Sequence, residues 1–254
     1  MFNFYQLVIY FSICSFLGWV VETFFCSLQH GKFVFRGFLA GPVCPIYGFG
    51  ALLVLFLLVP FSSNAILVYV FGVIVMTALE YFVSYLLEKL FKKSFWDYSN
   101  HRYHINGRVN LTFSLFWGLL CLVVVYLVYP AAESLIGLMS GKFQIVTAVV
   151  ILVTLALDLL YSVRYTLLFN RELLTLNSIS ERIDKIRADL FESAEEKKAK
   201  LEEDMALLLS QQEERAKRVF RKMRRILDAF PKMRMSKKDR LSVRERINAY
   251  RNRK

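Results

Sequence analysis

Five long stretches of the chain consist almost entirely of apolar residues. They cover residues 4–28, 41–59, 65–87, 111–129 and 143–169. A helix that crosses the hydrocarbon layer of a membrane needs about 20 mostly apolar residues, and each stretch is close to that length. Apolar residues make up 56% of the chain and the mean hydropathy is +0.41, which excludes a chain that is soluble as a whole. The sequence therefore predicts an all-α polytopic membrane protein with five transmembrane helices.

The loops between these stretches alternate in their content of basic residues. The loop before the second stretch carries Lys32 and Arg36, and the loop between the third and fourth stretches carries five basic residues. The loops after the second and fourth stretches carry one lysine between them, whereas the chain after residue 169 is strongly basic. Because basic loops stay on the cytoplasmic side, we predict a multi-pass plasma-membrane protein with its N-terminus outside and its C-terminal tail in the cytoplasm.

The second stretch begins irregularly, with the segment RGFLAGPVCPIYGFG at residues 36–50. Proline removes a backbone donor and interrupts a regular helix. Such backbone is tolerated at membrane depth only where protein or water satisfies its polar groups. We therefore predict a broken or partly re-entrant start to this span.

The first two stretches resemble the third and fourth. In each pair, an acid-bearing stretch is followed by a basic loop and then by an aromatic, glycine-containing stretch that ends at a proline. In this comparison Glu22 corresponds to Glu80, and Gly48 corresponds to Gly118. Both pairs start on the same side of the membrane, so the pattern predicts a parallel duplication of a two-helix unit. The alternative is the loose similarity that any two helical hairpins share.

Three acidic residues lie within the apolar stretches: Glu22, Glu80 and Asp158. A charged acid at the centre of a membrane helix costs about 2.5–3.5 kcal/mol, so we expect these side chains to face the bundle interior or a watery cavity. Two interpretations stay open. The carboxylates either form a binding site for a ligand, an ion or a proton, or they form structural ion pairs with arginines at a similar depth. The candidate partners are Arg36, Arg108 and Arg164.

The loop between the third and fourth stretches concentrates aromatic and polar residues beside the membrane. Its candidate binding residues are Trp96, Asp97, Asn106 and Arg108. One interpretation is a site for a lipid head group or a phosphate, to which Arg36 and Arg108 donate. The other is an amphipathic turn that anchors the chain at the membrane surface.

Sequence motifs for metal or nucleotide chemistry are absent from the chain. His101 and His104 have helix-compatible spacing but no obvious third ligand, so we expect no metal site and no cofactor. No GxxxxGK[ST] motif occurs, and GxSxG and HExxH are also absent. We assign no catalytic residue, and the four cysteines are expected to serve as small packing residues.

The chain beyond the fifth stretch divides into two parts. Residues 170–230 contain neither glycine nor proline before Pro231, and their apolar residues recur at intervals of three and four. This pattern predicts a coiled-coil-like cytoplasmic helix, either as one rod of about 90 Å or as a hairpin that turns near residue 192 at a capping box beginning at Ser193. Residues 231–254 form a basic tail.

Charge in this region is strongly one-sided, because residues 215–254 contain 17 basic and 3 acidic side chains. We expect this end of the chain to bind anionic lipid of the inner leaflet, with a solvated tail as the alternative. Nucleic acid is not an expected partner, because the membrane surface is the nearer anion.

Five segments of the chain resemble the putative ABC-transporter type IV family of bacterial membrane proteins. They are FLGWVVE at 16–22, FVFRGFLAGPVCPIYGFGA at 33–51, LEYFVSYLLEKLF at 79–91, WDYS at 96–99 and NGRVNLTFSLFWG at 106–118. The resemblance covers residues 13–165 and implies a permease that works with a separate ATPase. It marks seven motif positions: Glu22, Arg36, Glu80, Trp96, Asp97, Asn106 and Arg108.

These observations lead to three functional hypotheses. The first is a permease-like transport subunit whose site near the cytoplasmic face contains Glu22, Glu80 and Arg36, together with Arg108 and Asp158. The second is a membrane scaffold or regulator that recruits a cytoplasmic or envelope-assembly partner through its cytoplasmic helix. The candidate protein partners are an ATPase, an envelope-assembly protein and further copies of the chain in a homo-oligomer. The third is a lipid-modifying membrane enzyme. The corresponding domains are residues 1–169, 170–230 and 231–254.

Overall fold

The computed structural model describes residues 2–192, 195–231, 233–234 and 242–251 of the chain. Apart from one short two-stranded hairpin, the regular structure in these ranges is helical, which confirms the predicted all-α class. The helices are α1 (Phe4–His30), α2 (Pro45–Leu57), α3 (Ala65–Phe91), α4 (Leu111–Val123), α5 (Tyr129–Gly137), α6 (Gly141–Glu192), α7 (Glu195–Lys222), α8 (Arg224–Ala229) and α9 (Val243–Arg251). A 3-10 turn, η1 (Val59–Phe61), follows α2, and a π-helical turn, η2 (Val124–Val128), joins α4 to α5.

Four helical segments in the described part of the chain are long and apolar enough to cross a membrane: Phe4–Leu28, Ala65–Phe91, Leu111–Gly137 and Gly141–Leu190. The predicted count of five is not confirmed, because α2 has only 13 residues and a length of about 20 Å. The reason lies in the prolines of the segment before it. Residues 32–44 are non-helical, and Pro45 occupies the first turn of α2, where its missing N–H is tolerated.

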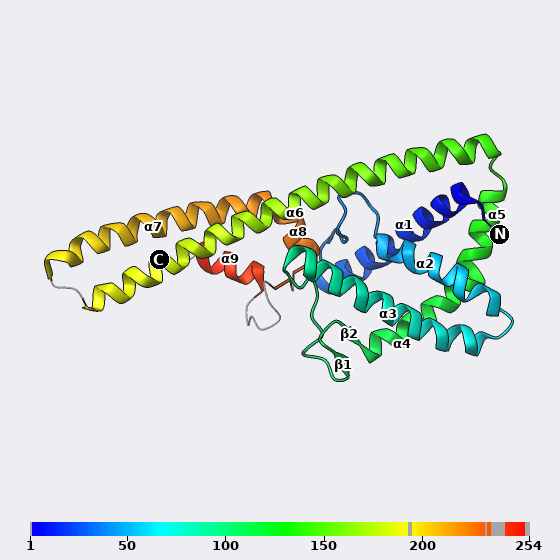
Figure 1. The fold of residues 1–254 in the computed structure, drawn as a ribbon, viewed down its shortest axis with the longest axis horizontal. Helices are drawn as coiled ribbons and strands as arrows, with labels where there is room; N and C mark the ends of the chain where they lie inside the picture. The colour runs from blue at the N-terminus through cyan, green and yellow to red at the C-terminus, as the bar shows by residue number, and fades with distance from the viewer. Residues whose placement is uncertain (1, 193–194, 232, 235–241, 252–254) are drawn as a thin grey trace.

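The helices run back and forth between two ends of an elongated molecule (Figure 1). The N-terminus lies at one end, and a helical hairpin of α6 and α7 extends from the other, which we call the hairpin end (Figure 1). The segment between α1 and α2 and the segment between α3 and α4 both lie toward the hairpin end (Figure 1). The loops and helices with the most basic residues are therefore gathered at one end of the molecule.

The fourth apolar segment extends further than the sequence indicated. We expected a span ending at Tyr129 and a loop beginning at Pro130, but α5 continues the helix to Gly137. The π-helical turn η2 precedes Pro130, and the proline falls in the first turn of α5. A single π turn shifts the hydrogen-bond register, which lets the chain accept a proline without ending the helix.

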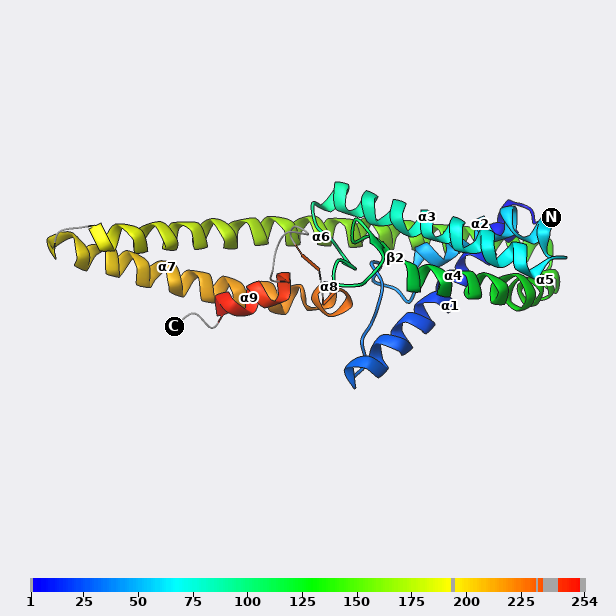
Figure 2. The same ribbon diagram turned by 90° about the horizontal axis from the view of Figure 1, so that it is seen from below.

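The last apolar stretch and the start of the tail form one uninterrupted helix. α6 has 52 residues, which corresponds to about 78 Å. α7 then runs back beside α6 (Figures 1 and 2), so the prediction of a single rod is wrong and the hairpin alternative is correct. Ile179, Ile183 and Leu208 form a buried seam between the two helices. The capping box expected at Ser193 lies outside the described residues.

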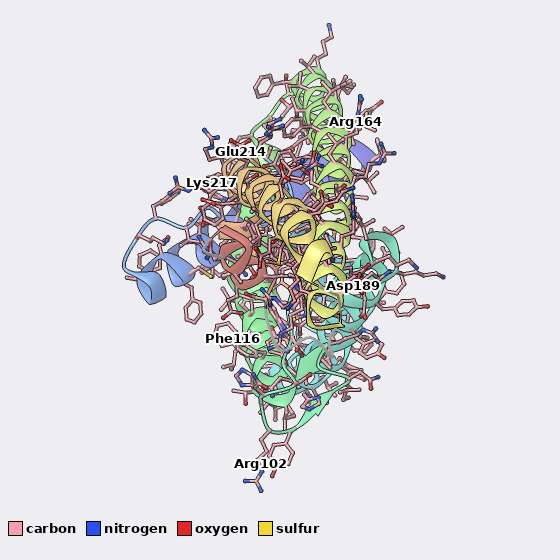
Figure 3. All side chains as sticks on the ribbon, turned by 90° about the vertical axis from the view of Figure 1, so that its left-hand side faces the viewer. Arg102, Phe116, Arg164, Asp189, Glu214 and Lys217 are labelled. Carbon is pink, nitrogen blue, oxygen red and sulfur yellow. The ribbon has the colours of Figure 1, made fainter. Side chains whose placement is uncertain are left out.

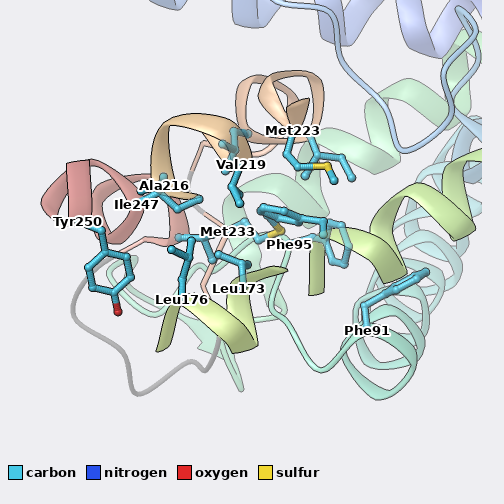
Figure 4. Packing of buried hydrophobic residues seen from close by; sticks show 14 residues of the cluster. Phe91, Phe95, Leu173, Leu176, Ala216, Val219, Met223, Met233, Ile247 and Tyr250 are labelled. Atoms are coloured by element: carbon cyan, nitrogen blue, oxygen red, sulfur yellow. The ribbon is translucent and has the colours of Figure 1, made fainter. Parts of the chain in front are cut away.

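A hydrophobic cluster fixes the base of this hairpin to the helix bundle (Figure 4). It combines residues from the end of α3, the segment after it, α6, α7, α8 and α9. Its members include Phe91, Phe95, Phe169, Leu173, Leu176, Ala216, Val219, Met223, Met233, Ile247 and Tyr250. Ile247 of α9 is fully buried in this cluster. The described part of the basic tail is therefore packed against the hairpin base, and it is not a solvated extension.

Candidate functional site

Glu22 lies on α1 and faces the non-helical segment 32–44. The thiol of Cys44 donates a hydrogen bond of 3.7 Å to the Glu22 carboxylate. The Arg36 guanidinium lies 3.9 Å from the same carboxylate, and both side chains are partly exposed. Arg36 also donates a hydrogen bond to the carbonyl of Ala229 and lies over the ring of Phe230 at 5.5 Å. The structure thus brings together the predicted residues Glu22 and Arg36, with Arg36 shared between α1 and the end of α8.

Glu80 lies on α3, and only 6% of its surface is exposed. Its two carboxylate oxygens accept hydrogen bonds from the Tyr98 hydroxyl at 3.2 Å and from Trp117 Nε1 at 3.0 Å. Burial raises the pKa of Tyr98, and the adjacent Glu80 charge raises it further, so Tyr98 remains a hydrogen-bond donor. Among the described residues Glu80 has no ion pair, and Arg108, one of the candidate partners, pairs with Glu88. Two neutral donors stabilise this carboxylate instead.

A small cavity connects Glu80 to α2 and α4. It is lined by Ile46, Tyr47, Met76, Leu79, Glu80 and Trp117. The rings of Tyr47 and Trp117 meet edge to face at 5.6 Å. The Tyr47 backbone N–H donates a hydrogen bond of 3.1 Å to the carbonyl of Cys44, whose thiol donates to Glu22, so a run of contacts leads from Glu22 through Tyr47 and Trp117 to Glu80. We call Glu22, Tyr47, Glu80, Tyr98 and Trp117 the carboxylate cluster.

The three aromatic members of the carboxylate cluster were missed in the sequence. Tyr47 directly precedes Gly48, and Trp117 directly precedes Gly118. An aromatic residue next to a glycine at corresponding positions of the two helix pairs was the available signal. Tyr98 carried a weaker signal, because its hydroxyl reaches Glu80 only through the packing of the loop between α3 and α4 onto α3.

Asp158 on α6 binds the backbone of the non-helical segment 32–44 and is not part of the carboxylate cluster. Its two oxygens accept hydrogen bonds from the backbone N–H groups of Ala40, at 2.7 Å, and Gly41, at 2.8 Å. Ser162 donates to it as well, at 3.1 Å. Arg164 is exposed and points outward (Figure 3), so the expected ion pair between Asp158 and Arg164 is not formed. Asp158 holds the segment 32–44 against α6.

Asp97 and Trp96 also stabilise loop structure. The Asp97 side chain is 3% exposed and pairs with Arg234 at 2.9 Å. Its other oxygen accepts a hydrogen bond from the Ser99 backbone N–H at 2.9 Å. Trp96 Nε1 donates to the carbonyl of Arg108 at 3.0 Å. Ser94 and Arg234 exchange backbone hydrogen bonds of 3.0 and 2.9 Å, so this part of the loop is joined to the chain after α8.

The rest of the loop between α3 and α4 forms a β-hairpin, which the sequence analysis did not predict. β1 (His104–Ile105) pairs antiparallel with β2 (Val109–Asn110). Asn106 and Gly107 lie between them with positive φ angles of 52° and 64°. An Asn-Gly pair is a strong hairpin signal, because both residues adopt this left-handed conformation readily.

Arg108 and Asn106, at the turn of this hairpin, both contact α3. The Arg108 guanidinium pairs with Glu88 at 2.7 Å and donates to the Tyr81 hydroxyl at 3.2 Å. The Asn106 amide donates to the same hydroxyl at 3.0 Å. Asn106 and Arg108 thus contact α3, Asp97 contacts Arg234, and Trp96 contacts the backbone of Arg108.

Lys93 is a buried cation that the sequence analysis overlooked. It is 3% exposed, donates a hydrogen bond to the Asn170 side chain, and lies over the ring of Phe169 at 4.7 Å. Burial lowers the pKa of Lys93 from 10.5 to about 7. The residue stands where α3 ends against α6.

Among the described residues, no group of three or more histidine, cysteine or acidic side chains is placed to hold a metal ion. His104 Nδ1 accepts a hydrogen bond of 3.1 Å from the Gly107 backbone, and the ring of His101 packs against Tyr98. Cys14, Cys44 and Cys121 are buried, and Cys26 is half-buried.

Comparison with known protein families matches residues 9–163 to the family described as Putative ABC-transporter type IV. No curated protein and no solved structure matches the chain. The matched range contains the carboxylate cluster and all eight candidate site residues, whereas α7, α8 and α9 lie outside it. Because this range is more than half of the chain and holds its apolar spans, the protein belongs to the Putative ABC-transporter type IV family and is a transporter-related multi-pass membrane protein.

Proposed function

We propose that this protein is a permease-like membrane subunit of a transport system, with its ligand site at the carboxylate cluster. The observation that carries the proposal is the run of contacts from Glu22 through Cys44, Tyr47 and Trp117 to Glu80, beside a cavity lined by Tyr47 and Trp117. Buried ionisable residues in membrane helices are typical of substrate and ion pathways. The chain has no nucleotide-binding motif, so a separate ATPase would supply the energy.

The proposal includes five crossings, with α2 and the non-helical segment 32–44 together forming one broken span. Its support is the position of the basic segments. The segment between α1 and α2, whose sequence contains two basic residues, and the basic loop after α3 lie toward the hairpin end, opposite the N-terminus (Figure 1). With basic segments in the cytoplasm, the N-terminus is outside and the hairpin of α6 and α7 is inside.

The proposed duplication is supported by matching close contacts in the two helix pairs. A Cβ atom on Gly48 would lie 2.2 Å from Ser15 and 2.6 Å from Phe11, and one on Gly118 would lie 2.6 Å from Val73 and 2.8 Å from Tyr69. Ser15 and Phe11 precede Glu22 by seven and eleven residues, and Val73 and Tyr69 precede Glu80 by the same intervals. The two acids thus occupy corresponding places in two equivalent hairpins, as expected for a site on a pseudo-symmetry axis.

We further propose that the base of the hairpin couples an ATPase to this site. Arg36 links the Glu22 carboxylate to the carbonyl of Ala229 in α8. Arg225, also in α8, donates to the carbonyl of Leu39 at 2.7 Å. Any partner that moves α8 would therefore move the segment that carries Arg36 and Cys44.

Purification of the full chain from native membranes tests the proposed function. Chemical cross-linking and mass spectrometry of the purified complex should identify an ATP-binding subunit joined to the hairpin of α6 and α7. A complex that contains only envelope-assembly proteins, and no ATP-binding subunit, would contradict the permease role and favour the scaffold.

One observation favours the scaffold as a second candidate: the hairpin extends far from the bundle (Figure 2). Residues 171–214 contain 12 acidic and 7 basic side chains, which gives this arm a negative surface. Deleting residues 171–254 is too severe a test, because it removes most of the hydrophobic cluster at the base. Replacing residues 180–211 with a short turn removes the distal arm and retains Leu176 and Ala216. A scaffold loses its partner in this variant, whereas a permease keeps its site.

No observation favours the lipid-modifying enzyme, because Asp97 and Arg108 are engaged with Arg234 and Glu88.

A further inference from the structure

An open groove runs between α3, the β-hairpin and α4, away from the carboxylate cluster. Its empty volume, including its open side, is about 1260 Å³. Val73, Ile74 and Ala78 of α3 form one apolar wall, and Ile105, Val109 and Leu111 form the other. Ile74 and Leu111 lie on two apolar helical segments of spanning length and are exposed, so this groove opens at the side of the membrane domain.

The groove changes from apolar to polar along α3. Tyr81 lines it one turn beyond Ala78, and its hydroxyl accepts hydrogen bonds from Asn106 and Arg108. Lys89 and Lys92 follow further along the chain and are exposed. The polar mouth therefore faces the end of α3 that carries positive charge, as a site at the membrane surface requires.

Two donors at this mouth are available for an anion. His104 lines the groove, and its Nδ1 accepts a hydrogen bond from the backbone, which leaves Nε2 as the proton-bearing donor in the neutral ring. Arg102 lies next to the mouth: its guanidinium is over the ring of Tyr103, which lines the groove, at 5.3 Å and extends outward (Figure 3). No ion pair among the described residues involves Arg102. Arg108 contributes less, because Glu88 balances its charge.

We propose that this groove binds one anionic diacyl phospholipid, with an acyl chain along Ile74 and Ala78 and the phosphate at Arg102 and His104. Amphipathic lining fits a molecule that is apolar at one end and anionic at the other, and the lateral opening admits it directly from the bilayer. A partner helix fits less well, because the polar end of the groove offers the His104 donor and the adjacent Arg102 cation, which suit an anionic head group. The assignment to the inner leaflet rests on the proposed orientation, whereas the binding itself is independent of the transport function.

Native mass spectrometry of the full chain in detergent tests this proposal. The protein is titrated in separate experiments with phosphatidylglycerol, phosphatidylcholine and inorganic phosphate. One phosphatidylglycerol should be retained in preference to phosphatidylcholine. Arg102→Glu with His104→Ala should reduce that preference by about fivefold or more, which corresponds to about 1 kcal/mol per basic residue near the surface. Lys142→Glu is the matched charge reversal, because Lys142 is exposed and near the opposite end of the bundle.

A second variant separates the acyl-chain site from the head-group site. Ala78 is exposed within the groove, so Ala78→Phe should fill it and abolish retention of both lipids. Ala131 is exposed on α5 and provides the matched control Ala131→Phe, with equal unfolding temperatures showing that both variants are folded. The proposal would be overturned if the unsubstituted protein retained the two lipids equally or bound only inorganic phosphate. Lipid retention by Ala78→Phe would also overturn it, as would a co-purified peptide cross-linked in the groove.

Discussion

Arg225 of α8 donates a hydrogen bond of 2.7 Å to the carbonyl of Leu39, in the non-helical segment before α2. The next two backbone N–H groups of that segment, at Ala40 and Gly41, bind the Asp158 carboxylate. The segment is therefore fixed on one side by the hairpin base and on the other by α6. This arrangement explains how a stretch without helical hydrogen bonds keeps a defined position beside Glu22.

Arg225→Ala is expected to loosen the segment 32–44. The substitution leaves the Leu39 carbonyl without this donor, which costs about 1–3 kcal/mol when the group is buried. Hydrogen exchange of residues 32–44 should become faster, and the unfolding temperature should fall. Arg224→Ala is the matched control, because the Arg224 side chain is 73% exposed and pairs with Asp228, one turn along the same helix. Equal exchange in the two variants would contradict the proposed contact.

Asp158→Ala is expected to free the same segment from α6. It removes two charge-assisted hydrogen bonds to backbone N–H groups, each worth about 1.5–3 kcal/mol. Asp158→Asn keeps one carbonyl oxygen and should have the smaller effect on hydrogen exchange. Arg164→Ala should have no effect, because Arg164 is exposed and does not pair with Asp158. If Arg164→Ala loosened the segment as much as Asp158→Ala, the ion-pair interpretation would be restored.

Gly48→Ala and Gly118→Ala are expected to destabilise the two helix pairs to a similar extent. A new Cβ atom at either position would lie within 2.6 Å of a side chain on the partner helix. Such overpacking costs about 1–3 kcal/mol. Gly137→Ala provides the control, because a Cβ there meets nothing within 4 Å. Thermal unfolding in detergent should show lower midpoints for the first two variants only, and unequal responses would argue against the duplication.

The stability of the protein is expected to depend on the titration of Lys93. Its folded-state pKa of about 7 lies below the ordinary value of 10.5, so the unfolded chain binds the additional proton between these values. Stability should therefore rise as the pH increases from about 7 to about 10.5, with the full burial penalty present below about 7. Lys93→Met should flatten this rise.

The control for this titration is Lys92→Met, because Lys92 is the adjacent exposed lysine. Urea or thermal unfolding of both variants across this pH range measures the slope. A slope that persists in Lys93→Met but disappears in Lys92→Met would show that the titrating group had been wrongly assigned.

The sequence was sufficient for the helical class and for most of the apolar segments, because hydrocarbon imposes a length and a composition that are visible residue by residue. It was insufficient where a proline acts differently in different surroundings. Pro45 starts a helix that is too short to span by itself, whereas Pro130 is absorbed behind a π turn and the helix continues. Local sequence does not distinguish these outcomes, since each depends on the hydrogen bonds available around the proline.

The carboxylate cluster was only half visible in the sequence. Glu22 and Glu80 stood out in the sequence as acids among apolar residues. Their donors Tyr98 and Trp117 were hidden among many aromatic residues. The contact between Asp97 and Arg234 joins residues 137 positions apart, and its formation depends on the hairpin folding back. Such pairings are set by tertiary packing, which no local pattern specifies.

The carboxylate cluster is tested most directly by measuring ATP hydrolysis in the complex purified from native membranes, with Glu22→Gln and Glu80→Gln compared against Glu133→Gln. Glu133 lies on α5, near the opposite end of the bundle, and is exposed. We predict that the two cluster variants assemble and unfold like the unsubstituted protein but lose transport-coupled hydrolysis, while Glu133→Gln retains it. Full hydrolysis in Glu22→Gln and Glu80→Gln, or loss of folded complex in both, would contradict a functional site and leave the two acids with a purely structural role.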